Sequence, residues 1–415
     1  MTAFDRVERH LPELFDELAG AGIPDYFDDM LQSTTQARQR PAWSSLERWL
    51  PMGVIARPLL IRPIPWRLIA VVAMLVLLAA AAAAYVGSRR VAPPPFGLAR
   101  NGALLIGTAD GDIVTVDPAT GRATPVVSGP TFDGGPFYSH DGQRFVFNRG
   151  TSATDTATAL YIADANGSGA NELFPVGPDV GWLEWSPTDD RILTTPTVDG
   201  KGTIAIVNLA DRTRTNVPID LDVAAASWRP DHDQFVVTAK SGGNSTFWVV
   251  NTDGSGKRPI PVSPYAINTP ALSPDGSRLA YATWEPGGIE GRIRIVDIDT
   301  GGDRTLTPNV YDGYVWQGPW FSPEGTHLLL NRFLKDTATV TSQVATLATD
   351  GSGTATVMGP ETGNPPADAI YSPDGTTIIA TYNAGVTWMF DADGTNPRKA
   401  PFTAIRGQTW QRQGR

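Results

Sequence analysis

The sequence contains no cysteine. This absence excludes disulfide bonds, thiol catalysis and zinc or iron–sulfur sites with cysteine ligands. Histidine is also scarce, with four residues in 415, and no H-x-x-x-H or H-E-x-x-H pattern joins two of them. Such patterns place two imidazoles on one helix face, where they bind zinc. We therefore expect no metal site.

Charged side chains make up only 18% of the chain, and the formal net charge is -10. Because Lys and Arg contacts to phosphate drive binding to nucleic acid, this acidic balance argues against a nucleic-acid partner. Gly (42), Pro (35) and Trp (12) are instead abundant. That composition is typical of short strands separated by tight turns, not of a disordered chain.

One long uncharged run divides the chain. Residues 68–86 read LIAVVAMLVLLAAAAAAYV, which is 19 residues without a charge. At about 1.5 Å per residue, a helix of this length crosses the hydrocarbon core of a membrane. Trp66 and Tyr85 lie where interfacial aromatic side chains are expected. We predict a single transmembrane helix over 68–86; a buried core helix and a cleaved signal peptide are the alternatives.

Arginines flank this run on both sides. Three follow it, Arg89, Arg90 and Arg100, and six precede it, at positions 38, 40, 48, 57, 62 and 67. Since the side with more positive charge stays in the cytoplasm, we predict a cytoplasmic N-terminus at the cell membrane and an extracytoplasmic remainder. Residues 87–100, which include three consecutive prolines, are interpreted as a semi-rigid linker.

Residues 1–67 have the pattern of a small helical segment. Apolar residues recur at helical spacing from Phe4 to Leu18, and Pro24 could open a second helix. The first thirty residues carry eight acids, whereas residues 38–67 carry six arginines. The basic half could face anionic lipid, and the acidic half could bind a cytoplasmic regulatory protein. A solvated tail is the alternative.

A repeat occupies the rest of the chain. An aromatic or apolar residue followed by a Ser-Pro-Asp-Gly-like turn recurs six times, at spacings of 47, 43, 44, 49 and 50 residues. The copies are residues 138–142, 185–189, 228–232, 272–276, 321–325 and 371–375. Strand-like runs and Gly-rich turns follow each copy. A period of this length with several strands per unit is typical of a β-propeller blade.

The turn itself has a mechanical explanation. Proline presets φ, aspartate bonds to the local backbone, and glycine tolerates positive φ. We therefore expect these aspartates to be structural and not catalytic. Two copies depart from the pattern, at 186–190 and 229–233, and their turns are expected to differ in shape.

This pattern resembles the TolB-type, WD-like propeller repeat, which also occurs in the propeller domains of prolyl-oligopeptidase-type enzymes. The resemblance covers residues 101–415 and implies an all-β propeller. It indicates little about function, because propellers carry many unrelated activities.

The two ends of the repeat region complement each other. Residues 103–127 contain three strand-like runs without an inner strand before them, and residues 408–412 resemble a lone inner strand. Joined, they would form one composite blade that closes the ring. We predict seven blades over residues 101–415, with six as the alternative if either end stays outside the ring.

Sequence patterns for catalysis are missing. The nucleophile pattern G-x-S-x-G does not occur, nor does a phosphate-binding glycine loop. The Asp-Gly turns lack the later ligands of a calcium loop. We therefore expect neither enzyme activity nor a cofactor.

Aromatic residues mark the best candidate binding surface. A loop between the second and third strands of one blade and the blade-to-blade loop after it should be neighbours at one rim of the channel. Their candidate residues are Trp284, Glu285, Tyr311, Tyr314 and Trp316. Trp and Tyr are favoured contacts for partners and could also stack on sugars. The alternative is that Trp316 packs between blades, an alternative favoured more strongly for Trp320.

These observations predict a membrane-anchored, extracytoplasmic propeller that acts as a non-catalytic binding domain for a protein or a glycan. The alternative is a transmembrane signalling regulator, similar in layout to anti-sigma regulators, with a sensor propeller outside and a partner-binding head inside. An enzyme that processes glycans or peptides is the third hypothesis.

Overall fold

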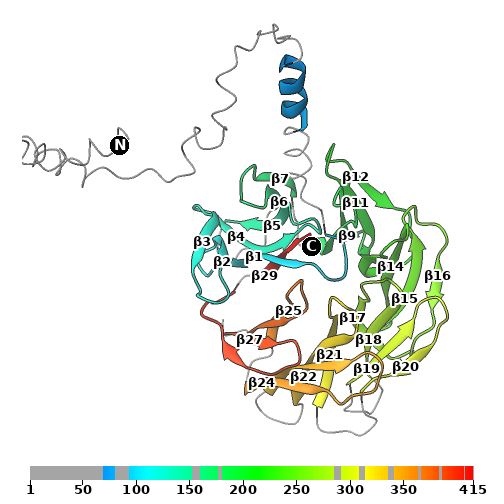
Figure 1. Cartoon of the computed structure of the whole chain (residues 1–415). Coiled ribbons are helices and arrows are strands. Elements are labelled where there is room, and N and C mark those ends of the chain that lie inside the picture. Colours follow the sequence, from blue (N-terminus) through cyan, green and yellow to red (C-terminus); the bar gives the residue numbers. More distant parts are fainter. Residues whose placement is uncertain are drawn as a thin grey trace, which may run out of the picture. The chain divides into compact units, whose positions relative to one another are not determined.

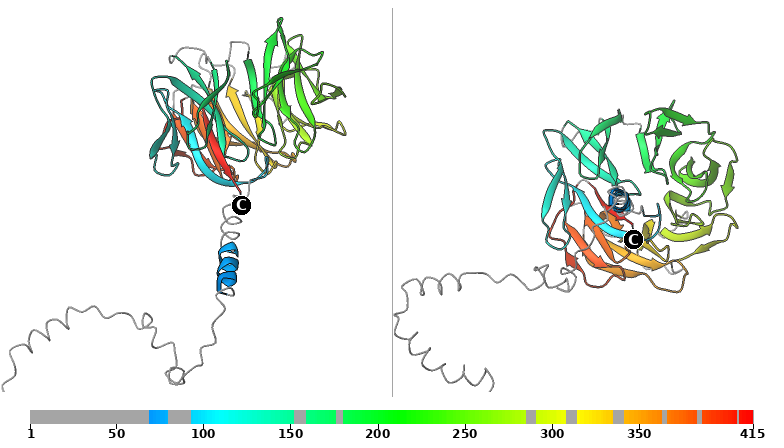
Figure 2. Two further views of the ribbon diagram at one scale, coloured as in Figure 1. Left: turned by 90° about the horizontal axis from the view of Figure 1, so that it is seen from above. Right: turned by 45° about the horizontal axis from the view of Figure 1, so that its top comes forward.

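The computed structural model describes residues 69–79, 93–151, 159–175, 180–284, 291–307, 314–334, 341–362, 366–382, 386–405 and 407–414. Seven antiparallel sheets follow one another, six of four strands and one of five. Figure 1 shows them as blades around a common axis, and Figure 2 shows the ring from two further directions. The prediction of an all-β propeller with seven blades is confirmed.

The first blade joins the two ends of the repeat region. Its inner strand is β29 (Gln408–Gln413), followed outward by β1 (Arg100–Gly107), β2 (Ile113–Val116) and β3 (Ala123–Val127). Strand β1 runs antiparallel to β29, with Leu104 opposite Trp410. The predicted composite blade is therefore confirmed. It closes the ring, so the inner edge of β1 does not remain unpaired.

The other six blades use consecutive strands. Blade 2 contains β4 (Phe132–Tyr138), β5 (Arg144–Gly150), β6 (Ala159–Asp164) and β7 (Asn171–Pro175). Blade 3 contains β8 (Val180–Trp185), β9 (Arg191–Val198), β10 (Lys201–Gly202), β11 (Ile204–Asn208) and β12 (Arg214–Val217). Blade 4 contains β13 (Val223–Trp228), β14 (Gln234–Ser241), β15 (Asn244–Asn251) and β16 (Arg258–Ile260).

The last three blades complete the ring. Blade 5 contains β17 (Ala266–Leu272), β18 (Arg278–Trp284), β19 (Gly291–Asp297) and β20 (Asp303–Thr305). Blade 6 contains β21 (Tyr314–Phe321), β22 (His327–Leu334), β23 (Thr341–Ala348) and β24 (Thr356–Thr362). Blade 7 contains β25 (Pro366–Tyr371), β26 (Thr377–Tyr382), β27 (Thr387–Asp391) and β28 (Arg398–Lys399).

The hydrophobic core lies between blades. Side chains alternate across each strand, so Phe145 and Phe147 of β5 pack against blade 1 while Val146 between them packs against blade 3. All three are almost fully buried. Each sheet therefore has two apolar faces, which explains why its second strand reads as a continuous apolar run.

The Ser-Pro-Asp-Gly turns connect the inner strand of a blade to its second strand. At Ser273, the hydroxyl donates to Asp275 Oδ1 over 2.5 Å, and the Gly276 amide donates to the Ser273 carbonyl over 2.8 Å. Gly276 has a φ of 67°, which is in the left-handed region that favours glycine. The aspartate therefore holds its own turn, as predicted.

The two departing copies behave differently from each other. Asp189 occupies the glycine position and keeps its positive φ, at 56°. In the other copy the positive φ moves one residue earlier, to Asp231 at 57°. The predicted change of shape therefore holds for the second copy, whereas the first keeps the regular shape with a non-glycine residue.

Residues 69–79 form a helix in a separate compact unit, residues 1–87. Its apolar side chains are largely exposed, Leu77 by 69%. Within the parts of the chain that the structure describes, no helix is long and apolar enough to cross a membrane. The rest of the predicted span, at 68 and 80–86, and the predicted head over 1–67 lie outside the described residues.

Candidate binding site

The strand ends that border the two predicted rim loops lie side by side. Trp284, the last residue of β18, pairs with Gly291 of β19. A Cβ added to Gly291 would lie 2.7 Å from Val315 Cγ1 and 3.1 Å from the Trp316 amide nitrogen. The end of blade 5 therefore contacts the start of β21 directly. Two predicted site residues, Glu285 and Tyr311, lie outside the described residues.

The tryptophans of β21 are arranged differently from the sequence expectation. Trp316 is buried between blades 5 and 6, where the Arg332 guanidinium lies 5.7 Å from its ring centroid. This is the packing alternative, so Trp316 offers little surface to a partner. Trp320, for which burial was favoured more strongly, is 54% exposed. The register shift between Gln317 and Trp320 explains this error, because a β-bulge re-aims the side chains that follow it.

Of the five predicted site residues, only Trp284 and Trp316 therefore have described side chains. Tyr314 opens β21 opposite Leu334, which places its backbone at the rim. The structure brings the borders of the two loops together, and a binding role for these residues stays a prediction.

The opposite face of the ring carries the Ser-Pro-Asp-Gly turns and is called the turn face. Residues 93–99, the strap, lie against it. The Arg412 Nη2 atom donates to the carbonyls of Pro94 and Gly97 over 2.9 and 2.8 Å, and the Ala99 amide donates to the Pro373 carbonyl over 2.9 Å. Phe96 packs against the His140 ring at 4.8 Å between centroids. This part of the predicted linker is thus bound to the propeller.

A polar cluster around the buried Asp189 lies beneath the strap. Asp189 accepts hydrogen bonds from the amides of His140 and Asp141, both over 2.8 Å. Burial raises the pKa of Asp189 to about 6 and lowers the pKa of His140 to about 4. Burial also lowers the pKa of Arg412 to about 10. The sequence did not indicate this cluster, because its members come from three different blades.

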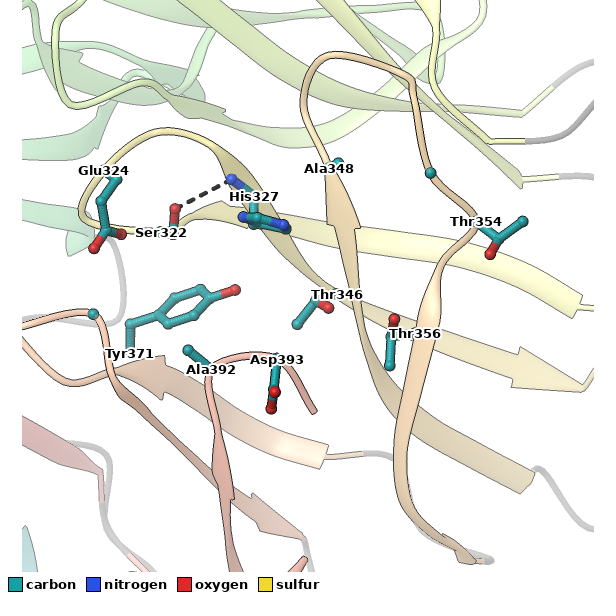
Figure 3. A pocket seen from close by; sticks show the side chains of 12 residues that line it. Ser322, Glu324, His327, Thr346, Ala348, Thr354, Thr356, Tyr371, Ala392 and Asp393 are labelled. Carbon is teal, nitrogen blue, oxygen red and sulfur yellow. Dashed lines mark hydrogen bonds between the residues drawn. The ribbon is translucent and has the colours of Figure 1, made fainter. Parts of the chain in front are cut away.

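A cavity of about 450 Å³ opens on the turn face between blades 6 and 7. Figure 3 shows Glu324 and His327 on the blade 6 side and Tyr371 on the blade 7 side, with the Tyr371 hydroxyl directed towards the middle of the cavity. That hydroxyl is buried and has no hydrogen-bond partner among the described residues. Three threonines also line the cavity: Thr346, Thr354 and Thr356.

No group of three or more His, Cys, Asp or Glu side chains that could hold a metal ion occurs within the described parts of the ring. Several aspartates in the turns between strands accept hydrogen bonds from nearby backbone amides and hydroxyl groups. Asp393, for example, accepts from the amide and the hydroxyl of Thr395, and the hydroxyl bond comes first in lowering the pKa of Asp393. These carboxylates therefore have structural partners.

The arrangement of seven antiparallel blades, closed by a strand from the C-terminal end, decides the fold. The chain is a seven-blade β-propeller. No protein-family model matches the sequence, and a search of curated proteins finds no match.

Among solved structures, an oligogalacturonate lyase in complex with manganese is similar over 72% of this chain and 85% of that chain, with 15% identity and a TM-score of 0.54. A prolyl endopeptidase structure is similar over 75% of this chain and 51% of that chain, with 14% identity and a TM-score of 0.54. TolB from Acinetobacter baumannii matches over 74% of this chain and 66% of that chain, with 16% identity and a TM-score of 0.47. At these identities, the likeness establishes the fold alone.

Proposed function

We propose that the protein is a membrane-anchored, extracytoplasmic propeller that binds a protein or a glycan without catalysis. The observation that carries this proposal is the strap. Residues 93–99, a described part of the predicted linker, are bound to the turn face. The rim at Trp284 lies on the face of the ring opposite the strap.

The anchor is argued from residues 68–86 and the exposed apolar helix at 69–79. Exposure of that many apolar side chains to water is unfavourable, at about 25 cal/mol for each Å². A lipid environment removes this cost. The non-catalytic role is argued from the structural use of the turn acids and from the lack of a nucleophile pattern.

Single-cysteine labelling tests the anchor and its orientation. The natural chain has no cysteine, so Ala119→Cys in an exposed turn of the propeller and Ser33→Cys before the apolar run each provide one label site. In intact cells, a membrane-impermeant maleimide should label the first variant only. Labelling of Ser33→Cys before lysis, or protection of Ala119→Cys, would contradict the proposed topology.

Photocrosslinking tests the binding role. A benzophenone residue at position 284 should capture an envelope protein or glycan, whereas the same residue at position 119 should not. Equal products from both positions would contradict a binding surface at the rim.

Signalling through the head is the second candidate function. It is favoured by the contrast between eight acids in the first thirty residues and six arginines over 38–67. Deletion of residues 1–48 should abolish crosslinking to a cytoplasmic regulator if the head binds one. An unchanged set of crosslinked proteins would leave the propeller as the functional part.

A further inference from the structure

One kind of contact between neighbouring blades recurs on the turn face. The residue that opens the second strand of a blade is often an arginine, and its guanidinium lies over the aromatic ring that ends the inner strand of the next blade. Three interfaces have this pair, with distances of 5.5, 4.9 and 5.8 Å to the ring centroid: Arg144 with Trp185, Arg191 with Trp228, and Arg278 with Phe321. Such contacts combine cation–π attraction with packing of the planar group.

A second contact recurs at several interfaces. The carbonyl of the fourth residue of the turn accepts a hydrogen bond from the preceding blade. Arg278 Nη2 donates to the Gly325 carbonyl over 2.9 Å, and an Arg144 nitrogen donates to the Asp189 carbonyl. Elsewhere another side chain supplies the donor. Gln411 donates to the Gly142 carbonyl over 2.7 Å, and Arg229 donates to the Gly276 carbonyl over 3.0 Å.

Blade 4 indicates that the pairing is specific. Its second strand opens with Gln234, and the facing position in blade 5 is Leu272. The arginine and the aromatic ring are therefore missing together. At this interface Arg229, which replaces the serine of the turn, fills the space and is 3% exposed.

Among the described residues, the interface between blades 6 and 7 has neither of these two contacts. The aromatic ring is present as Tyr371, but the opening residue of β22 is His327, which is shorter than arginine. In the described chain, the Gly375 carbonyl accepts no hydrogen bond from blade 6, and no ring contact joins His327 to Tyr371. The cavity of about 450 Å³ lies at this position (Figure 3).

The cavity also has a carboxylate that, in the described part of the chain, makes no hydrogen bond to the serine of its own turn. The third turn position, aspartate at 275 and 374, is here Glu324. Ser372 donates to Asp374 over 2.6 Å, whereas Ser322 makes no corresponding bond to Glu324 among the described residues. The Glu324 carboxylate instead reaches the neighbouring blade, where its Oε1 atom lies against the position that a Cβ on Gly375 would take. Glu324 thus adds a negative charge beside the Tyr371 ring, over which no described arginine lies.

We propose that this cavity binds a guanidinium group from outside the ring, in the place that an arginine fills at three other interfaces. The Tyr371 ring would stack on the planar cation, the Glu324 carboxylate would accept two of its N–H groups, and the Gly375 carbonyl would accept a third. The ligand is an arginine side chain of a peptide or a small guanidine. This inference does not depend on the proposed membrane anchor.

The test is a titration of the purified full-length chain with N-acetyl-L-arginine amide, followed by ligand-observed saturation-transfer NMR. The matched probe is N-acetyl-L-citrulline amide, which has the same shape without the charge. We expect millimolar binding of the arginine probe with the strongest saturation at its δ protons, and binding of the citrulline probe at least tenfold weaker. Equal binding of the two probes, or no binding of the arginine probe, would overturn the proposal.

Three variants locate the site. Glu324→Gln should weaken binding of the arginine probe at least tenfold, and Glu172→Gln, the same change on an exposed strand of blade 2, should leave it unchanged. His327→Arg should abolish binding and raise the thermal midpoint, because the new side chain fills the cavity as Arg278 does between blades 5 and 6. If Glu324→Gln binds as the natural chain does, the site is elsewhere, even if His327→Arg fails to fold.

Free L-arginine distinguishes the two sources of the group. A blocked probe that binds as well as free L-arginine supports a peptide arginine. Tighter binding of the free amino acid supports a small guanidine, because the exposed α-groups then contribute.

Discussion

Two neighbouring turns of the ring, at Ser273 and at Arg229, show what the repeat does and what a departure from it does. The Ser273 turn bonds within itself, through Asp275. Arg229 bonds outward, to the Gly276 carbonyl over 3.0 Å and to Asp299 Oδ2 over 2.5 Å, both in the next blade. The regular residue stabilises its own hairpin, whereas the departing one holds two blades together.

The other departing turn supports the same conclusion. Asp189 takes the glycine position and accepts two amides from blade 2, at His140 and Asp141. Non-glycine residues with positive φ are uncommon, and aspartate is among those that tolerate it. The Ser186 turn keeps its local bond to Asp190 over 2.9 Å and adds contacts across an interface, whereas at Arg229 the contacts across the interface replace the local serine bond.

Loss of the outward bonds should have the largest effect. Arg229→Ala should lower the free energy of unfolding by about 3 kcal/mol, because it leaves a cavity and unpaired acceptors at Gly276 and Gln234. Urea unfolding followed by tryptophan fluorescence measures this change. Arg229→Ser, which returns the residue of the repeat, should recover less than half of the loss.

The control is Arg258, which bonds to the other oxygen of Asp299 over 2.7 Å. Its side chain is 40% exposed, against 4% for Arg229. Arg258→Ala should cost less than about 1 kcal/mol. Equal losses for the two arginines would show that burial does not distinguish the two turns.

The pH dependence of the Asp189 turn should come next. Between about pH 4 and pH 6, His140 is neutral and Asp189 is protonated in the folded ring, whereas the unfolded chain has a protonated histidine and an ionised aspartate. Both states then bind one proton, so the pair contributes no slope to stability. Asp141, Arg144 and Arg412 are the other charged groups of this cluster.

Replacing either residue alone should make the free energy of unfolding depend on pH in this range. With Asp189→Asn, the unfolded chain binds one proton more, so stability should rise with pH from about 4 to 6.5, by up to about 1.4 kcal/mol for each pH unit. With His140→Gln, the folded ring binds one proton more, so stability should fall as pH rises from about 4 to 6. Urea midpoints across this range, taken as differences from the natural chain, measure both. If the urea midpoints of a variant and of the natural chain changed with pH in the same way, the assigned protonation states of His140 and Asp189 would be wrong.

The regular turn should be less sensitive. Ser273→Ala removes the donor to Asp275 and the acceptor for the Arg278 amide, which is 2.9 Å away. The expected loss is about 1 kcal/mol in the free energy of unfolding. A loss as large as that of Arg229→Ala in the same urea assay would remove the distinction between local and outward bonds.

The smallest effect is expected at an exposed turn. Arg398 lies 3.2 Å from Asp391, and the two side chains are 46% and 42% exposed. Solvent screens this pair, so Arg398→Ala should change the free energy of unfolding by less than about 0.5 kcal/mol. A salt-dependent loss above about 1 kcal/mol in urea titrations would contradict this expectation.

The sequence alone determined the architecture of the ring. The spacing of the turns defines the units, and the missing inner strand before residue 103 together with the lone strand at 408–412 predicts the composite blade. These features could be predicted because turn residues and strand alternation are local properties. The structural role of the turn aspartates follows from the same local chemistry.

Only the tertiary structure decided which side chains meet between blades. A bulge in β21 exposes Trp320 while Trp316 is buried, although the two lie in one short aromatic segment. Three further features bring together residues that are tens to hundreds of positions apart in the sequence. They are the strap, the cluster around Asp189 and the cavity lined by Tyr371. The reason is physical: a repeat specifies how each blade is built, but the space between two blades depends on the side-chain lengths that both contribute.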